Sequence, residues 1–140
     1  MRVLTLLLVC LAMLATASCR ESTRVAPPTP AFEQTYTVRG IIRSLKHPSR
    51  PNSELQIHHE EIPEFVNGAG QTAGMHAMTM PFPSLASEVS MSGVDVGDKV
   101  RFTFGVSWTQ VQGTTRRIPA WSITAIEELP ADTVLTIGTQ

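Results

Sequence analysis

The sequence predicts an all-β domain, and two observations point to this fold class. Several short segments alternate apolar and polar residues or are rich in β-branched and aromatic side chains, as half-buried strands are. Turn-forming proline, glycine, asparagine and serine separate these segments, and no stretch carries a long helical period. Short strands in one small domain predict a closed barrel or a sandwich, because both architectures bury one face of every strand.

Five strands are expected, and each has a local reason. The first is rich in β-branched residues and contains Gly40, which suits a bend or a close backbone approach. A turn with proline and serine at 48–53 ends it, and the second and fifth strands show apolar–polar alternation. Pro81 and Pro83 close the third strand, and a Gly-Asp turn precedes the fourth. The five ranges are 36–45, 54–59, 78–82, 99–108 and 118–129, with a glycine-rich loop at 67–74.

Two adjacent histidines end the second expected strand. Side chains along a strand point alternately to its two faces, so His59 should face inward with Leu55 and Ile57. His58 should then point outward, and we expect it to be an exposed surface residue. His59 is therefore the histidine that the alternation places toward the interior of the domain.

The first residues predict export. A positive start is followed by an apolar run at 3–15 that is too short to span a bilayer, and small residues at 16–18 precede Cys19. This resembles a bacterial lipoprotein signal peptide covering residues 1–18, in which Cys19 is lipidated and becomes the first residue of the mature chain. Thr16 departs from the pattern, since a leucine is usual there. The alternative is an ordinary secretory signal cut near Ala17, which would leave Cys19 a free thiol.

Removal of the leader leaves about 120 residues, enough for one compact domain. Residues 19–35 contain three prolines and few large apolar side chains, which predicts a tether between a membrane surface and the domain. We expect the β-barrel domain to occupy residues 36–130 and a short tail to occupy residues 131–140.

The composition excludes several functions. The formal net charge of −1, without a basic stripe, is a poor match to nucleic acid. Cys10 belongs to the leader, so the mature chain has no cysteine pair for a disulfide, a zinc site or thiol redox chemistry. No nucleophile has an evident base, which favours a binding protein over an enzyme. An acidic patch, interpreted as a solvated face, comprises Glu60, Glu61 and Glu64.

Methionine is concentrated in one short segment. Of the six methionines, three lie within residues 75–80, and these are Met75, Met78 and Met80. On a strand, Met78 and Met80 share one face and Thr79 points to the other. Thioether sulfur is soft and uncharged, and it suits Cu(I) or Ag(I) far better than Zn, Mg or Ca. The alternative is that these methionines only fill a core.

Three runs of the sequence resemble the periplasmic copper- and silver-binding CusF family. They are His-Glu-Glu-Ile-Pro at 59–63, Met-Thr-Met-Pro-Phe at 78–82 and Val-Gly-Asp-Lys-Val-Arg-Phe-Thr-Phe at 96–104. The resemblance extends over residues 36–129 and implies a five-stranded closed barrel of the oligonucleotide-binding (OB) type. It also implies that His59, Met78 and Met80 are the metal ligands.

The family pattern is broken at one position. Family members place a tryptophan three residues before the first ligand methionine, where its ring covers Cu(I) by a cation–π contact. Met75 stands there in this chain, which implies either a third thioether ligand or a more open site. His76 is either an auxiliary ligand at the mouth of the site or a solvated side chain. A zinc or Cu(II) site built from His58, His59 and His76 is a weaker alternative, since it would not need the methionines.

The residues and the resemblance together predict an exported, lipid-anchored protein of the periplasm that binds Cu(I) or Ag(I). Its expected role is that of a metal chaperone or buffer that passes the ion to an efflux component or to another copper protein. We expect a monomer, attached to the membrane only through the lipid on Cys19, with no nucleic-acid partner. The alternative from a different functional class is an OB-fold adaptor lipoprotein that binds a protein and whose methionines are structural.

Overall fold

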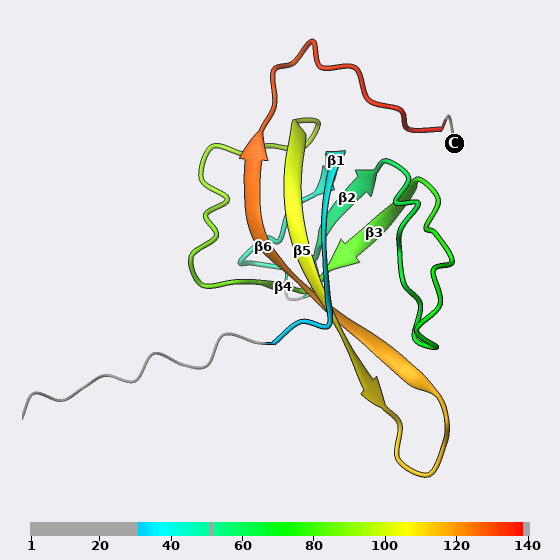
Figure 1. The fold of residues 1–140 in the computed structure, drawn as a ribbon. Coiled ribbons are helices and arrows are strands. Elements are labelled where there is room, and N and C mark those ends of the chain that lie inside the picture. Colours follow the sequence, from blue (N-terminus) through cyan, green and yellow to red (C-terminus); the bar gives the residue numbers. More distant parts are fainter. Residues whose placement is uncertain (1–30, 51, 139–140) are drawn as a thin grey trace, which may run out of the picture.

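The computed structural model describes residues 31–50 and 52–138, and in these residues all regular structure is β (Figure 1). The predicted all-β class is confirmed. No helix in the described part of the chain is long and apolar enough to cross a membrane. The signal peptide predicted for residues 1–18, the lipidation site Cys19 and most of the predicted tether lie outside the described residues. The strands are β1 (Gln34–Ser44), β2 (Leu55–His59), β3 (Met78–Phe82), β4 (Ser84–Leu85), β5 (Lys99–Gln110) and β6 (Arg117–Glu128).

The strands form one curled sheet in the order β3-β2-β1-β5-β6-β4. Neighbouring strands are antiparallel, except that β4 runs parallel to β6. Because only Pro83 separates β3 from β4, consecutive residues join the two edges of the sheet. The indole Nε1 of Trp121 on β6 also donates a hydrogen bond of 3.0 Å to the carbonyl of Pro81 on β3. The sheet therefore curls back on itself in the manner of a small barrel, as expected (Figure 1).

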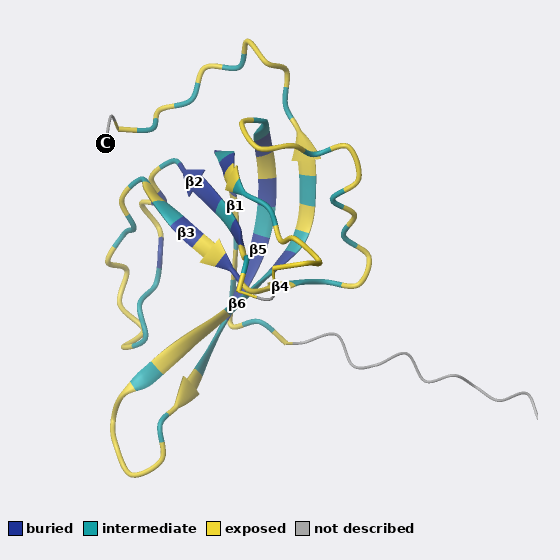
Figure 2. Ribbon diagram, turned by 180° about the vertical axis from the view of Figure 1, so that it is seen from behind, coloured by how far each residue is buried: buried dark blue, intermediate teal, exposed yellow. Residues whose placement is uncertain are grey.

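The apolar core lies on the concave face of this sheet (Figure 2). Alternate residues of β5 point into it, which is the pattern of a half-buried strand. The rings of Phe82, Phe102 and Phe104 pack together, with centroid separations of 5.3 to 5.9 Å. Two of these rings come from β5 and one from β3, so the core joins strands that lie far apart in the sheet order.

Gly40 permits the close approach that its position in the sequence predicted. A Cβ atom there would lie 2.6 Å from the carbonyl oxygen of His58 and 2.8 Å from Cγ2 of Ile57. Any other residue would push β1 away from β2. Gly40 is paired with His59 in the register of these two strands, so this contact fixes the backbone that carries His59.

Two segments lie outside the body of the curled sheet. The β5–β6 hairpin projects from the body of the domain as a largely exposed arm (Figure 2). The segment after β6 runs from the start of β5, where it contacts Lys99, to Glu60 just after β2, and we call residues 130–138 the C-terminal strap (Figure 1). The amino group of Lys99 donates to the carbonyls of Ala131 and Thr133, at 2.5 and 2.7 Å. The strap is therefore fixed to the sheet at β5.

Candidate metal site

The register between β2 and β3 brings the predicted ligands to one face of the sheet. His59 lies opposite Met78, and Ile57 lies opposite Met80. Residues that oppose each other in an antiparallel pair point to the same side, and diagonal neighbours are within reach of long side chains. One face of this strand pair thus carries an imidazole and two thioethers. Thr79 lies opposite His58 and faces the other side.

The imidazole of His59 is fully buried and held in one orientation. Its Nδ1 lies 2.6 Å from the carbonyl oxygen of Glu60, and a carbonyl can only accept, so Nδ1 carries the proton. Nε2 is buried and has no hydrogen-bond partner among the residues that the structure describes. Burial lowers the pKa of His59, the bond to the Glu60 carbonyl opposes this shift, and His58 lowers the pKa further. A neutral imidazole with a free Nε2 is the form that binds a metal ion.

The two methionines of the motif differ in exposure. Met80 is 3% exposed and belongs to the core, whereas Met78 is 44% exposed at the end of β3 nearest His59. The candidate donors are therefore a buried imidazole, a buried thioether and a thioether open to solvent. All three donors are uncharged, and two are soft sulfur atoms, which fits Cu(I) or Ag(I).

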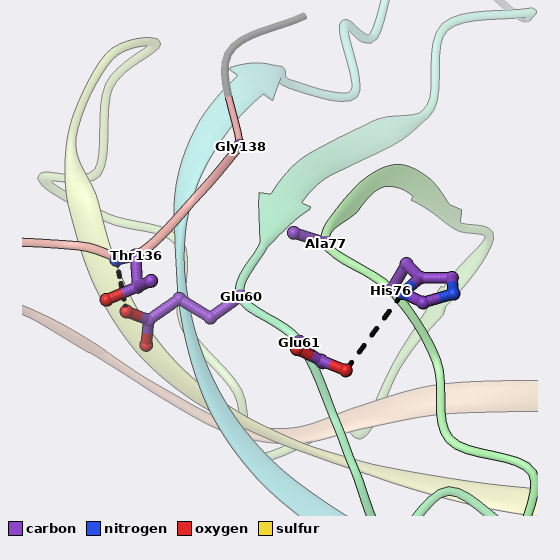
Figure 3. A pocket seen from close by; sticks show the side chains of 6 residues that line it. All are labelled: Glu60, Glu61, His76, Ala77, Thr136 and Gly138. Atoms are coloured by element: carbon purple, nitrogen blue, oxygen red, sulfur yellow. Dashed lines mark hydrogen bonds and ion pairs between the residues drawn. The ribbon is translucent and has the colours of Figure 1, made fainter.

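Met75 and His76 occupy different environments just before β3. Met75 is partly buried against the core, and its backbone exchanges two hydrogen bonds with Ile62. His76 is almost fully exposed, and its Nδ1 is 4.0 Å from a carboxylate oxygen of Glu61 (Figure 3). The imidazole of His76 thus lies on the surface, in an open pocket whose lining residues are Glu60, Glu61, His76, Ala77, Thr136 and Gly138.

His58 points away from the thioethers, as the alternation predicted, but the expectation that it is exposed is wrong. It is 2% exposed, and its Nδ1 lies 2.9 Å from the hydroxyl oxygen of Thr79. Burial lowers the pKa of His58, and the positive charge of Arg43 lowers it further. The periodicity of a strand predicts the face to which a side chain points. It does not predict whether other parts of the chain bury that face.

The alternative zinc or Cu(II) site gains no support from this arrangement. His58 and His59 lie on opposite faces of β2, and His76 is a surface residue. Within residues 31–50 and 52–138, no three His, Cys, Asp or Glu side chains are grouped so that they could hold a metal ion.

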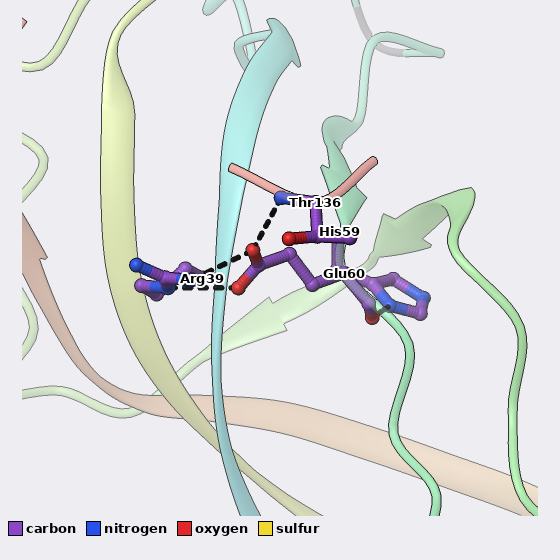
Figure 4. Close-up of polar contacts among 4 residues, drawn as sticks. All are labelled: Arg39, His59, Glu60 and Thr136. Atoms are coloured by element: carbon purple, nitrogen blue, oxygen red, sulfur yellow. Dashed lines mark hydrogen bonds and ion pairs between the residues drawn. The ribbon is translucent and has the colours of Figure 1, made fainter. Parts of the chain in front are cut away.

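The sequence did not reveal the polar cluster next to His59. The carboxylate of Glu60 accepts two hydrogen bonds of 2.8 Å from Arg39, and one of 2.6 Å from the backbone N–H of Thr136 (Figure 4). The sequence predicts that Glu60 belongs to a solvated acidic patch, but its side chain is only 13% exposed. The one hint in the sequence was its position directly after the candidate ligand.

A curled β-sheet that carries an imidazole and two thioethers on one face has the features of a small barrel that binds a soft metal. The chain matches the family described as "Copper binding periplasmic protein CusF" over residues 35–115, more than half of its length, and it belongs to that family. No curated protein and no solved structure matches the chain. The resemblance found in the sequence is confirmed, and the family's description agrees with copper as the metal and the periplasm as the compartment. That description names metal binding and no reaction.

Proposed function

We propose that this protein binds Cu(I) or Ag(I) in the periplasm through Nε2 of His59 and the thioethers of Met78 and Met80. The observation that carries the proposal is the place of His59 on the face of the strand pair that also carries Met78 and Met80. Its Nδ1 is hydrogen-bonded to the carbonyl of Glu60, and its Nε2, like that of His58 on the opposite face, is buried without a partner among the described residues. A buried polar atom with no partner is costly, and a metal ion bound on the thioether face would satisfy it.

The proposed role is transfer of the ion rather than catalysis. Met78 is exposed, so a ligand from a partner can approach the ion on that side while His59 and Met80 still hold it. Uncharged donors give up a monovalent soft ion more readily than thiolates would, and this favours stepwise exchange. The receiver would be a metal efflux component or another copper protein of the periplasm.

Met75 is the least constrained member of the proposed site. It holds the position of the tryptophan that the family places over the ion, and it is partly buried beside the core. It either adds a third thioether or leaves the ion more open than a ring would. Replacing Met75 with tryptophan would restore the aromatic cover and would show which of these applies.

We further propose that Cys19 is lipidated and anchors the protein to a membrane, with the proline-containing segment as a tether. The proposal rests on the signal-like residues 1–18 and on Cys19 itself. Membrane fractionation of the exported protein tests it. The native chain should follow the membrane fraction and Cys19→Ser the soluble fraction, and equal behaviour of the two would contradict a lipid anchor.

The main test is competition for Cu(I) against a colorimetric chelator. The native protein should withdraw Cu(I) from the chelator, and a variant carrying Met78→Ile and Met80→Ile should lose most of this ability. Met91→Ile is the matched control, because Met91 is a partly buried methionine that lies outside β2 and β3. Equal competition by the native and the doubly substituted protein would rule out a thioether site.

The competing function is that of a protein-binding adaptor whose methionines are structural. If the methionines only filled the core, both should be buried. Met80 is buried, but the exposure of Met78 argues against a purely structural role. In the competition experiment an adaptor would leave the chelator fully loaded with Cu(I).

A further inference from the structure

Glu60 connects the candidate metal ligand to the far end of the chain. Its backbone carbonyl accepts the hydrogen bond from Nδ1 of His59, at 2.6 Å. Its carboxylate accepts two hydrogen bonds from Arg39 on β1 and one from Thr136 of the C-terminal strap (Figure 4). One residue is thus held from both sides, with its backbone against the ligand and its side chain against the strap.

The strap contacts the rest of the domain along one of its sides. Its burial alternates, with Thr133, Leu135 and Ile137 partly buried and Val134 and Thr136 exposed. This is the pattern of an extended segment lying with one side on a surface. Lys99 holds two of its carbonyls at β5, and Glu60 holds the N–H of Thr136 beyond β2. The strap therefore extends from β5 to Glu60, the residue that follows the candidate ligand His59.

We propose that Glu60 is a positioning residue for the metal ligand and that the C-terminal strap, with Arg39, holds it in place. A fixed carbonyl at Glu60 keeps the proton on Nδ1 of His59, and this leaves Nε2 free on the thioether face. Partners that orient a ligating histidine typically change metal affinity by about 10- to 100-fold when they are removed. The inference rests on the proposed function, and it adds a positioning element, Thr136, that lies 76 residues after Glu60 in sequence.

The sheet supplies a matched control for this cluster. Arg101 and Glu127 form an ion pair of 2.6 Å on β5 and β6. Arg101 is paired with Arg39 in the strand register, so both ion pairs lie on the same outer face of the sheet. Both residues of the control pair are about half exposed, and neither bonds to His59 or to the strap. A substitution that breaks this ion pair removes a similar interaction but leaves the contacts between Glu60, His59 and the strap intact.

The first readout needs no metal. In the metal-free full-length protein, nitrogen chemical shifts of the His59 ring report which nitrogen carries the proton. The native protein and Glu127→Ala should show protonated Nδ1 and unprotonated Nε2. Glu60→Ala keeps the backbone carbonyl but frees it from Arg39 and Thr136, and it should give a mixture of the two tautomers. An unchanged His59 ring in Glu60→Ala would overturn the proposal.

The second readout is competition for Cu(I) against the chelator. Glu60→Ala should bind about tenfold more weakly than the native protein, while Glu127→Ala should bind like it. Lys99→Met releases two strap carbonyls without changing Glu60, Arg39 or His59, and it should give a smaller loss in the same direction. This variant also serves if Glu60→Ala does not fold. Equal losses in Glu60→Ala and Glu127→Ala, or no loss in a folded Lys99→Met, would contradict a role of the strap.

The two readouts separate this inference from the proposed function. If the native protein does not compete for Cu(I), the proposed function fails, and the ring nitrogens still decide whether Glu60 and the strap position His59. If the native protein binds Cu(I) and every variant binds it equally, the proposed function stands and the positioning role is wrong.

Discussion

His58 and His59 are adjacent in sequence and nearly equally buried, yet the two faces of β2 give them different chemistry. In both imidazoles Nδ1 has a hydrogen-bond partner, and Nε2 is buried without one among the described residues. His59 shares its face with Met78 and Met80, whereas His58 shares the opposite face with Thr79. Burial alone therefore does not make a ligand. The neighbours across the strand pair decide the role of each histidine.

The largest expected effect is on metal affinity and separates the two faces directly. His59→Leu should weaken Cu(I) binding by more than about 100-fold, because removal of a ligand should cost more than a change in the residues that orient it. His58→Leu should leave Cu(I) affinity within a few-fold of the native value. Competition against a chelator measures both. Similar losses in the two variants would mean that the faces do not differ as described.

An intermediate effect is expected in the pH dependence of stability. Burial is the main cause that lowers the pKa of both His58 and His59 below the ordinary 6.5. The unfolded chain then binds more protons than the folded one below pH 6.5, so stability should be full above this pH and fall as the pH drops through the lowered pKa values. Urea unfolding of the metal-free protein between pH 7.5 and 5, compared with that of each His→Leu variant, would divide the loss between the faces.

A second group provides an internal reference for that experiment. The Arg117 side chain is the main cause that lowers the pKa of the Glu33 carboxyl below 4.5. The ionised Glu33 carboxylate should therefore stop contributing to stability only as the pH falls below 4.5. This lies outside the pH range in which the two histidines take effect. A native protein that keeps its full stability down to pH 5 would show that the histidines are not buried in their neutral form.

The smallest effect is expected on the outer face. Thr79→Val removes the hydroxyl that bonds to His58, and it should destabilise the protein by about 1 kcal/mol. Thr79→Ser keeps the hydroxyl and should retain most of the native stability. Urea unfolding at pH 7.5 measures both variants. If valine and serine have the same effect, the hydrogen bond does not link the two strands as described.

The sequence predicted the strands well because their signals are local. The predicted strand at 78–82 has the observed bounds of β3, since prolines mark that segment, and of the two roles predicted for Gly40, a bend or a close backbone approach, the structure shows the close approach. The two-residue β4 was missed, because such a short strand leaves no alternation to detect. The sequence also predicted which candidate donors share a face, since the two-residue period of a strand determines this.

The rest depends on contacts between distant parts of the chain. Lys99 holds the strap through backbone carbonyls, which every residue has, so no residue type in the tail indicates the contact. The same holds for the N–H of Thr136, which binds Glu60 without involving the threonine side chain. The burial of His58 was missed for a related reason. The alternation within one strand does not indicate whether another segment covers its outward-facing side chains.

The coordination of Cu(I) in the loaded native protein tests the central claim most directly. X-ray absorption at the copper edge distinguishes sulfur from nitrogen neighbours by their distances and scattering. We predict one nitrogen from His59 and at least two sulfur atoms from Met78 and Met80, with one sulfur lost in Met78→Ile. A copper environment of nitrogen and oxygen alone, unchanged by that substitution, would contradict the proposed site.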